Sequence, residues 1–176
     1  MKAERSAYQW YQEQWGIPTT DDQQLFLLLT IGTFQAGLSW KLAASKREVF
    51  LENFHGMNIK KVAAMLPDEL EKLSQDPEMI RNPRKIQATV TNARAILAVQ
   101  QEFGSFSNFL WSFVDNRPQV TIYEERYEVP TRSDTATRAA KELKKRGFSF
   151  VGPVIMYMFM KAAGMIQDCV LNQEIT

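Results

Sequence analysis

The chain has 176 residues, 45% of them apolar and 23% charged, a composition typical of one globular domain, here residues 1–176, with a sizeable core. No apolar run is long enough to span a bilayer, the polar N-terminus lacks a secretory apolar stretch, and the lone Cys169 excludes an internal disulfide framework, so we expect a cytoplasmic protein. The formal net charge of +1 neither indicates nor excludes a nucleic-acid partner, because basic residues can gather locally.

Cap-forming residues mark four helix starts in the first half of the chain. Asp21 and Asp22 favour a start before the apolar residues 25–29, since acids stabilise the positive end of the helix dipole. Apolar residues at helical spacing follow each start. The predicted helices begin at Asp22, after Ser39 (to about Phe54), after Asn58 (to Leu66) and at Pro67.

The second half of the chain continues with the same helical patterns, each closed by a glycine or an irregular segment. The predicted helices run from Lys85 to about Phe103, from Ser105 through Phe113, from Asp134 to Arg146 and from Pro153 to about Ala163. Residues 115–132 form the one long irregular stretch, in which 120–123 could make a brief strand although no partner strand is visible. The sequence therefore predicts an all-α fold.

A short basic turn, residues 80–86, separates two of these helices. Asn82 ends the first one, because the residue before a proline is pushed out of the α region. Pro83 suits the first turn of the next helix, where free N–H groups could hold a phosphate together with the cations of Arg81, Arg84 and Lys85. Taken alone, the turn is better explained as a solvated loop that happens to be basic.

Aromatic residues gather near the N-terminus. Trp10, Tyr11 and Trp15 lie close together in sequence, and Trp40 follows the glycine-containing turn of residues 35–39. Each tryptophan alone is most simply a core residue. Several of them on non-core segments could instead form a pocket that holds a flat ligand such as a nucleobase. The spacing does not decide between the two interpretations.

Histidine-dependent and metal-dependent chemistry find little support. His55 is the only histidine, and it precedes Gly56 at a predicted helix end, where the helix dipole favours a cation. One histidine and one cysteine far apart cannot supply the clustered ligands of a structural zinc site. We expect no metal and no cofactor, and no residue stands out as a catalytic group.

Several short blocks of the chain occur in an order that is very improbable by chance. They are Trp-Gly-Ile-Pro at 15–18, Gln-Ala-Gly-Leu-Ser-Trp at 35–40, Lys-Arg-Glu at 46–48, the basic turn at 80–86, Asn-Ala-Arg-Ala at 92–95, Trp-Ser-Phe-Val at 111–114, Leu-Lys-Lys-Arg-Gly-Phe at 143–148 and Phe-Val-Gly at 150–152. With these blocks the chain resembles, over nearly its whole length, the 3-methyladenine DNA glycosylase I family of bacterial base-excision repair.

The resemblance implies a helix-hairpin-helix glycosylase fold, and it implies hydrolysis of the N-glycosidic bond of 3-methyladenine in double-stranded DNA with release of the free base. We expect the protein to be a monomer. The resemblance also implies contacts to the DNA backbone by Arg81, Asn82, Arg84 and Lys85 of the hairpin. It implies a wedge, which fills the gap left by the extruded base, made of Gln35 and Leu38. It implies a base pocket lined by Trp10, Trp15, Trp40, Gly32 and Phe34.

Departures from the family pattern bear on the chemistry. The family's pocket glutamate, which recognises the methylated base, falls at Gly32, and a pocket tyrosine falls at Trp10. The family's N-terminal zinc-binding cysteine has no counterpart, and its other three zinc ligands fall at Tyr11, Cys169 and Gln173. We therefore expect a metal-free protein whose termini are tied by packing.

Loss of the glutamate need not end catalysis, because a 3-methylated adenine is positively charged while bonded to the sugar and already leaves readily. Hydrogen bonds to charged groups contribute about 1.5–3 kcal/mol, so lesion discrimination is expected to fall by roughly one to two decades. Glu13 could compensate, although nothing in the sequence places it in the pocket. The main hypothesis is a DNA repair glycosylase, and the alternative, which Gly32 favours, is a non-catalytic DNA- or nucleobase-binding protein on the same scaffold.

Overall fold

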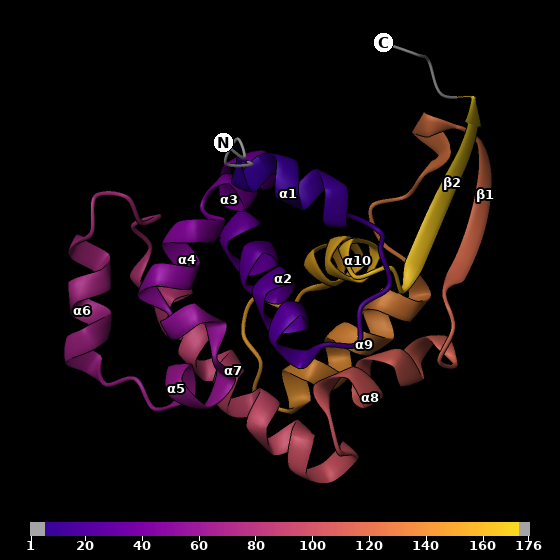
Figure 1. Ribbon diagram of the computed structural model, residues 1–176. Coiled ribbons are helices and arrows are strands. Elements are labelled where there is room, and N and C mark those ends of the chain that lie inside the picture. The colour runs from indigo at the N-terminus through magenta and orange to yellow at the C-terminus, as the bar shows by residue number, and fades with distance from the viewer. Residues whose placement is uncertain (1–5, 173–176) are drawn as a thin grey trace, which may run out of the picture.

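The computed structural model describes residues 6–172, and its body consists of helices, with one small sheet projecting as an arm (Figure 1). The helices are α1 Ala7–Gln14, α2 Asp22–Gln35, α3 Trp40–Ser45, α4 Arg47–Asn53, α5 Ile59–Ala63, α6 Pro67–Gln75, α7 Pro83–Phe103, α8 Phe106–Trp111, α9 Asp134–Lys145 and α10 Pro153–Ala162, with single 3-10 turns at His55–Met57, Ser112–Val114 and Arg126–Glu128. The strands are β1 Gln119–Glu125 and β2 Ile166–Asn172. The predominantly helical fold class is confirmed.

Capping chemistry places most helix starts where the sequence predicts them. At α2, for example, the Asp21 carboxylate accepts a hydrogen bond from the Gln24 N–H at 2.7 Å. Proline occupies the first turn of α6, α7 and α10, where its missing N–H costs no helical hydrogen bond. The cap residues whose side chains accept from the third following residue include Asp21, Ser39, Asn58, Ser105 and Ser133.

The helices differ from the sequence predictions most clearly in two places. The single helix expected from Ser39 to Phe54 is wrong, because Lys46 has φ −90° and ψ 10° and divides it into α3 and α4. Apolar periodicity continues across this residue, so the sequence pattern does not show the break. Helix α1 was not predicted, although Ser6 and Gln9 form a reciprocal capping box at its start.

The strand suspected at residues 120–123 has a partner. β1 runs parallel to β2, with Ile122 opposite Cys169, and together they form the arm that leaves the body in Figure 1. The expectation of an irregular stretch without a partner strand was therefore wrong. Parallel strands need a long crossover connection, here α9 and α10, so the partner lies far along the chain.

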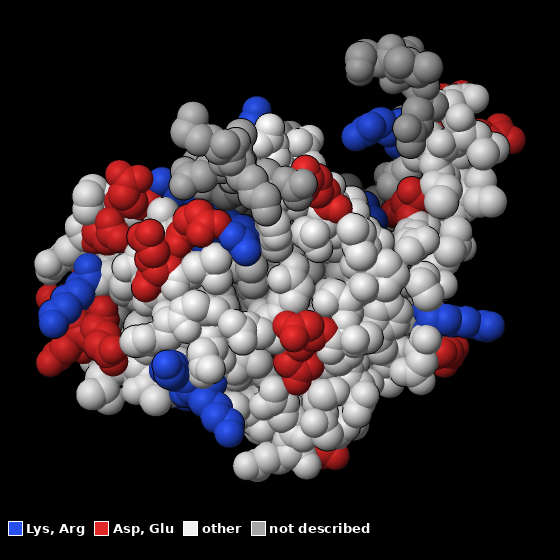
Figure 2. All heavy atoms as spheres, viewed as in Figure 1, with Lys and Arg blue, Asp and Glu red and all other residues white. Residues whose placement is uncertain are grey.

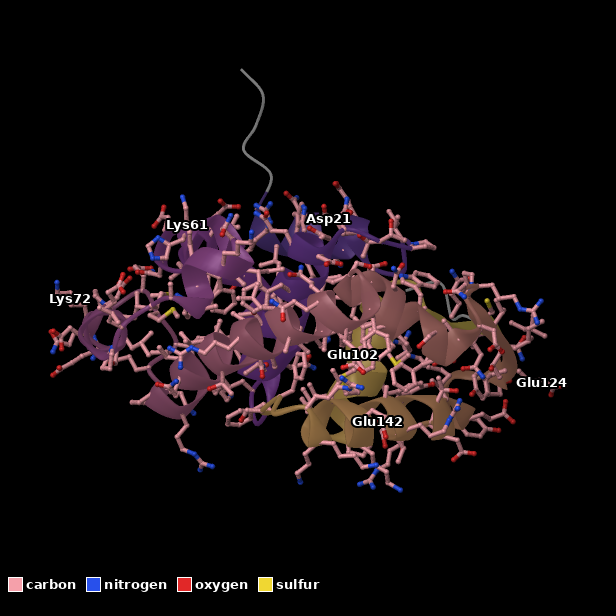
Figure 3. The ribbon with its side chains drawn as sticks, turned by 90° about the horizontal axis from the view of Figure 1, so that it is seen from below. Asp21, Lys61, Lys72, Glu102, Glu124 and Glu142 are labelled. Carbon is pink, nitrogen blue, oxygen red and sulfur yellow. The ribbon has the colours of Figure 1, made fainter. Side chains whose placement is uncertain are left out.

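Helix α2 runs through the core, and all of its residues from 25 to 34 are buried. Figure 1 shows α10 beside α2 and α1 above it, while Figure 3 places Lys72 of α6 and Glu124 of β1 at opposite ends of the molecule. No helix in the described part of the chain is long and apolar enough to cross a membrane. That residues 1–176 form one domain stays a prediction.

The loop between α1 and α2 is fastened to the end of α10. The Gly16 N–H donates to the Ala162 carbonyl at 3.1 Å and the Thr19 N–H to the Ala163 carbonyl at 3.2 Å. Gly164 lies so close that a Cβ on it would be 2.5 Å from the Pro18 nitrogen. These contacts hold Trp15, the first residue of the loop, in a defined place.

Candidate active site

A cavity of about 830 Å³ lies between the end of α1, helix α10 and the arm. Figure 2 shows a hollow between the arm and the body of the molecule. Its lining includes Trp15, Trp40, Arg126, Met158, Lys161 and Asp168. Volumes of this size are typical of small-molecule sites, so a purine ring fits.

The aromatic wall of this cavity is built around Tyr11. Its ring centroid lies 5.4 Å from those of Trp15 and Trp40, and the two indole centroids are 6.2 Å apart. Tyr11 is 3% exposed, and burial raises its pKa above the ordinary tyrosine value, so the ring acts as a neutral packing element. Of the predicted pocket residues, the structure therefore brings Trp15 and Trp40 together at a cavity.

Three other predicted pocket residues do not line this cavity. One face of Trp10 is occupied by the Arg47 guanidinium, whose Cζ lies 4.3 Å from the ring centroid. Phe34 is fully buried among core side chains. Gly32 is buried within α2, where an added Cβ would lie 3.4 Å from Cγ2 of Ile155. Both residues therefore lie outside the lining of this cavity, and their place in a base pocket stays a prediction.

A polar group that the sequence analysis missed lies on the opposite wall. Asp168 accepts a hydrogen bond from the Tyr157 hydroxyl, and its Oδ2 is 3.5 Å from the Lys161 ammonium nitrogen. Burial, followed by the contacts with Asp168, raises the pKa of Tyr157, which keeps its proton for this bond. The Asp168 side chain is 7% exposed and is the one carboxylate in the cavity lining formed by the described residues. Glu13 is exposed and is not part of that lining.

Asp168 has no local sequence signal that marks it as a pocket residue. Asp168 lies on β2, and without that strand no pattern in the sequence brings it near Trp15 or Trp40. An isolated aspartate after a glycine-closed helix is ordinarily a surface residue. Only the parallel pairing of β1 with β2 turns it toward the body of the protein.

The turn between α2 and α3 presents an apolar side chain to solvent. Leu38 is 42% exposed, and its N–H donates to the Gln35 carbonyl at 2.7 Å, which closes the turn. Gly37 has φ +76°, a backbone conformation that side chains disfavour. Trp40, two residues after Leu38, begins α3 at the cavity. An exposed wedge candidate and a pocket wall are thus parts of one short segment.

The side chains of the predicted phosphate-binding turn point in different directions. Arg81 and Arg84 are exposed at the start of α7, whereas the Asn82 side chain caps that helix by accepting from the Lys85 N–H at 3.2 Å. Lys85 is only 4% exposed, and its ammonium donates to the Phe34 carbonyl at 2.9 Å. The prediction that the Lys85 side chain contacts phosphate is corrected here, because its donors point into the protein.

A family model described as Methyladenine glycosylase matches residues 1–173. This chain belongs to the methyladenine glycosylase family. It is 43% identical over 163 residues to the Escherichia coli protein named DNA-3-methyladenine glycosylase 1, covering 93% of this chain and 87% of that one. A crystal structure of a variant 3-methyladenine DNA glycosylase I in complex with 3-methyladenine superposes with a TM-score of 0.90 at 35% identity, over 97% of this chain and 92% of the other. A Staphylococcus aureus family member has a TM-score of 0.87 at 37% identity, over 93% and 88%.

The zinc site that the family resemblance implies does not fit the residues present. Tyr11 is enclosed by indole rings, and Cys169 is exposed on β2. No group of three histidine, cysteine or acidic residues able to hold a metal ion occurs among residues 6–172, and Gln173 lies outside the described residues. We therefore derive no chemical step from a metal, and the metal-free state stays a prediction.

His55 lies just beyond α4, and its Nε2 is 3.6 Å from Glu69 Oε1. This contact pairs the histidine with a carboxylate and not with a nucleophile.

Proposed function

We propose that this protein hydrolyses the N-glycosidic bond of alkylated adenine, above all 3-methyladenine, in double-stranded DNA after extruding the damaged nucleotide. The main observation is that Leu38 is exposed on a tight turn and that Trp40, two residues later, lines a cavity large enough for a purine beside Trp15. A side chain able to fill the vacated place in the duplex thus adjoins a pocket for the extruded base. The family membership and the activity named for the relatives support the same conclusion.

The chemistry follows from the charge of the damaged base. A 3-methylated adenine is cationic while attached to the sugar, and indole faces attract cationic rings. As the bond between C1′ and N9 breaks, its electron pair neutralises the base, and water adds to C1′ with loss of a proton. The products are free methylated adenine and an abasic site. The protein needs to extrude, stack and hold the base, and we propose that Trp15, Trp40 and Asp168 do so.

Asp168 is proposed to contact the cationic base in place of the glutamate that falls at Gly32. Changing Asp168 to Asn should slow single-turnover release of 3-methyladenine by roughly 10- to 100-fold, because a hydrogen bond to a charged group contributes about 1.5–3 kcal/mol. Glu13→Gln, which removes an exposed carboxylate outside the cavity lining, is the matched control and should leave the rate unchanged. If Asp168→Asn and Glu13→Gln release 3-methyladenine at the same rate, and only the melting temperature of Asp168→Asn falls, then Asp168 stabilises the arm and does not contact the base.

DNA-backbone binding is proposed for Arg81 and Arg84, whose side chains are exposed at the start of α7. The Arg84→Ala variant should bind duplex DNA more weakly, and the slope of log K against log salt should become shallower by about 0.9, since one fewer counterion is displaced. Titrations at several salt concentrations measure this slope. Lys61→Ala, which removes an exposed cation on α5, is the matched control and should keep the full slope. An unchanged slope in Arg84→Ala would remove Arg84 from the phosphate contacts.

The decisive assay is release of free base from alkylated duplex DNA by the purified protein. Release above background supports the glycosylase. Retained DNA binding without release would favour the alternative, a binding protein on this scaffold, to which the missing carboxylate at Gly32 points. We propose further that the protein acts as a cytoplasmic monomer.

A further inference from the structure

Lys85 has an unusual position for a residue in a basic turn. Its ammonium is withdrawn from solvent and donates to the carbonyl oxygens of Phe34 and Ala36, at the end of α2. Burying an ammonium group is costly unless polar partners surround it, and this burial lowers the pKa of Lys85. The position therefore calls for an explanation beyond a solvated basic loop.

The end of α2 supplies a reason for this cation. The last carbonyl groups of a helix have no partner within the helix and carry the negative end of its dipole. No basic residue lies in the last turn of α2, and its C-cap residue, Ala36, has φ −52° and ψ 116°. Lys85, reaching across from α7, supplies the missing charge to this helix end.

The same contact joins the two DNA-facing segments. On one side are Asn82, which caps α7 through the Lys85 N–H, and the exposed Arg84. On the other side is the turn that closes through the bond between the Leu38 N–H and the Gln35 carbonyl. Because Ala36 lies within that turn, Lys85 fixes its distance from the first turn of α7.

We infer that Lys85 is a positioning residue, whose ammonium holds the turn carrying Leu38 in register with the phosphate-facing start of α7. Gripping of the DNA backbone by α7 then sets the wedge at the height of the base to be extruded. This role deepens the proposed function, and its DNA-related part rests on that function. The ordering of the turn by Lys85 does not, because it exists in the free protein. The role assigns to Lys85 a task different from that of Arg84, although the two are adjacent.

The test compares Lys85→Met, which removes the ammonium and keeps an apolar stem, with Arg84→Met as the matched exposed control. Hydrogen exchange of the free protein measures the ordering of the turn. The Leu38 amide should exchange about tenfold faster in Lys85→Met, since its turn has lost a charge-assisted restraint, and at the wild-type rate in Arg84→Met. If Lys85→Met folds poorly, Lys85→Gln, which keeps one donor group, replaces it. The exchange rate of the Leu38 amide in Lys85→Gln should lie between the wild-type rate and that expected for Lys85→Met.

Duplex DNA with 2-aminopurine beside the lesion then reports base extrusion separately from binding. At saturating protein, Lys85→Met should lose most of the fluorescence increase while keeping the wild-type salt slope of binding. Arg84→Met should show the reverse, a shallower slope with extrusion retained at saturation. Neither readout requires bond hydrolysis, so a protein without glycosylase activity can still be tested.

Two outcomes would overturn the inference. A salt slope shallower by about 0.9 in Lys85→Met would make Lys85 a phosphate ligand. Unchanged Leu38 exchange and unchanged extrusion, with only a lower melting temperature, would make it a purely structural residue. If the wild-type protein fails to bind duplex DNA, the proposed function fails by itself, and the exchange rate of the Leu38 amide alone decides whether Lys85 orders the turn.

Discussion

Replacing Trp40 by alanine is expected to slow single-turnover release of 3-methyladenine by roughly 10- to 100-fold, because stacking of a base on an aromatic side chain contributes about 1–3 kcal/mol. The indole of Trp40 lines the cavity and lies 6.2 Å from that of Trp15, so its removal opens one wall of the site. Rapid-quench measurement of free base from a defined alkylated duplex checks the rate. Trp40→Phe, which keeps an aromatic face, should recover part of it.

The matched control for Trp40 is Trp10→Ala. Trp10 belongs to the same aromatic cluster, but it is outside the cavity lining and one of its faces is taken by Arg47. Its loss is therefore expected to affect base release much less than the loss of Trp40. If Trp10→Ala is the more damaging change, the base is held on the other side of the cluster, and the proposed pocket is wrong.

Gly164→Ala is expected to lower the free energy of unfolding by about 2–4 kcal/mol, and the melting temperature by roughly 5–12 °C. Gly164 has φ +75°, a conformation that costs an alanine about 1 kcal/mol. The added Cβ would also lie 2.5 Å from the nitrogen and 2.7 Å from the Cα of Pro18. Both are backbone atoms, so no side-chain rotation relieves the clash. Thermal unfolding followed by circular dichroism measures the change.

Gly147→Ala separates the two contributions to the Gly164 effect. Gly147 has φ +88° but no atom within 4 Å of an added Cβ, so it shares the backbone strain without the clash. About 1 kcal/mol is expected for this variant. Equal losses at both positions would show that the contact between Gly164 and Pro18 relaxes freely. A larger loss at Gly164 should also slow base release, because the displaced loop begins at Trp15.

Local chemistry explains which parts of the fold could be predicted. Helix starts depend on a side chain and an N–H three residues apart, as for Ser39 and Leu42, so the sequence displays them directly. The helix break at Lys46 involves no glycine or proline, so the sequence pattern does not indicate it. The pairing of β1 with β2 depends on where α9 and α10 return the chain, which no local pattern contains.

Some residues of the candidate site could be expected from the sequence, and others could not. Spacing alone did not decide whether Trp15 and Trp40 belong to the core or to a pocket, and only the family resemblance implied a shared pocket. In the structure both indoles pack on Tyr11 beside the cavity. Lys85 could not be placed, since a sequence shows that a residue is charged but not where its long side chain ends. Asp168 was missed because its meaning arises only from contacts with Tyr157 and Lys161.

The arm has a consequence for handling the protein. Within the described residues its sheet has only two strands, so the outer edge of each pairs with no further strand, and Val120, Ile122 and Leu171 are exposed on the arm. Such borders template the addition of further extended chains. Concentrated or warmed preparations should therefore begin to aggregate there, and the nearby Cys169 thiol makes a reducing buffer the prudent choice.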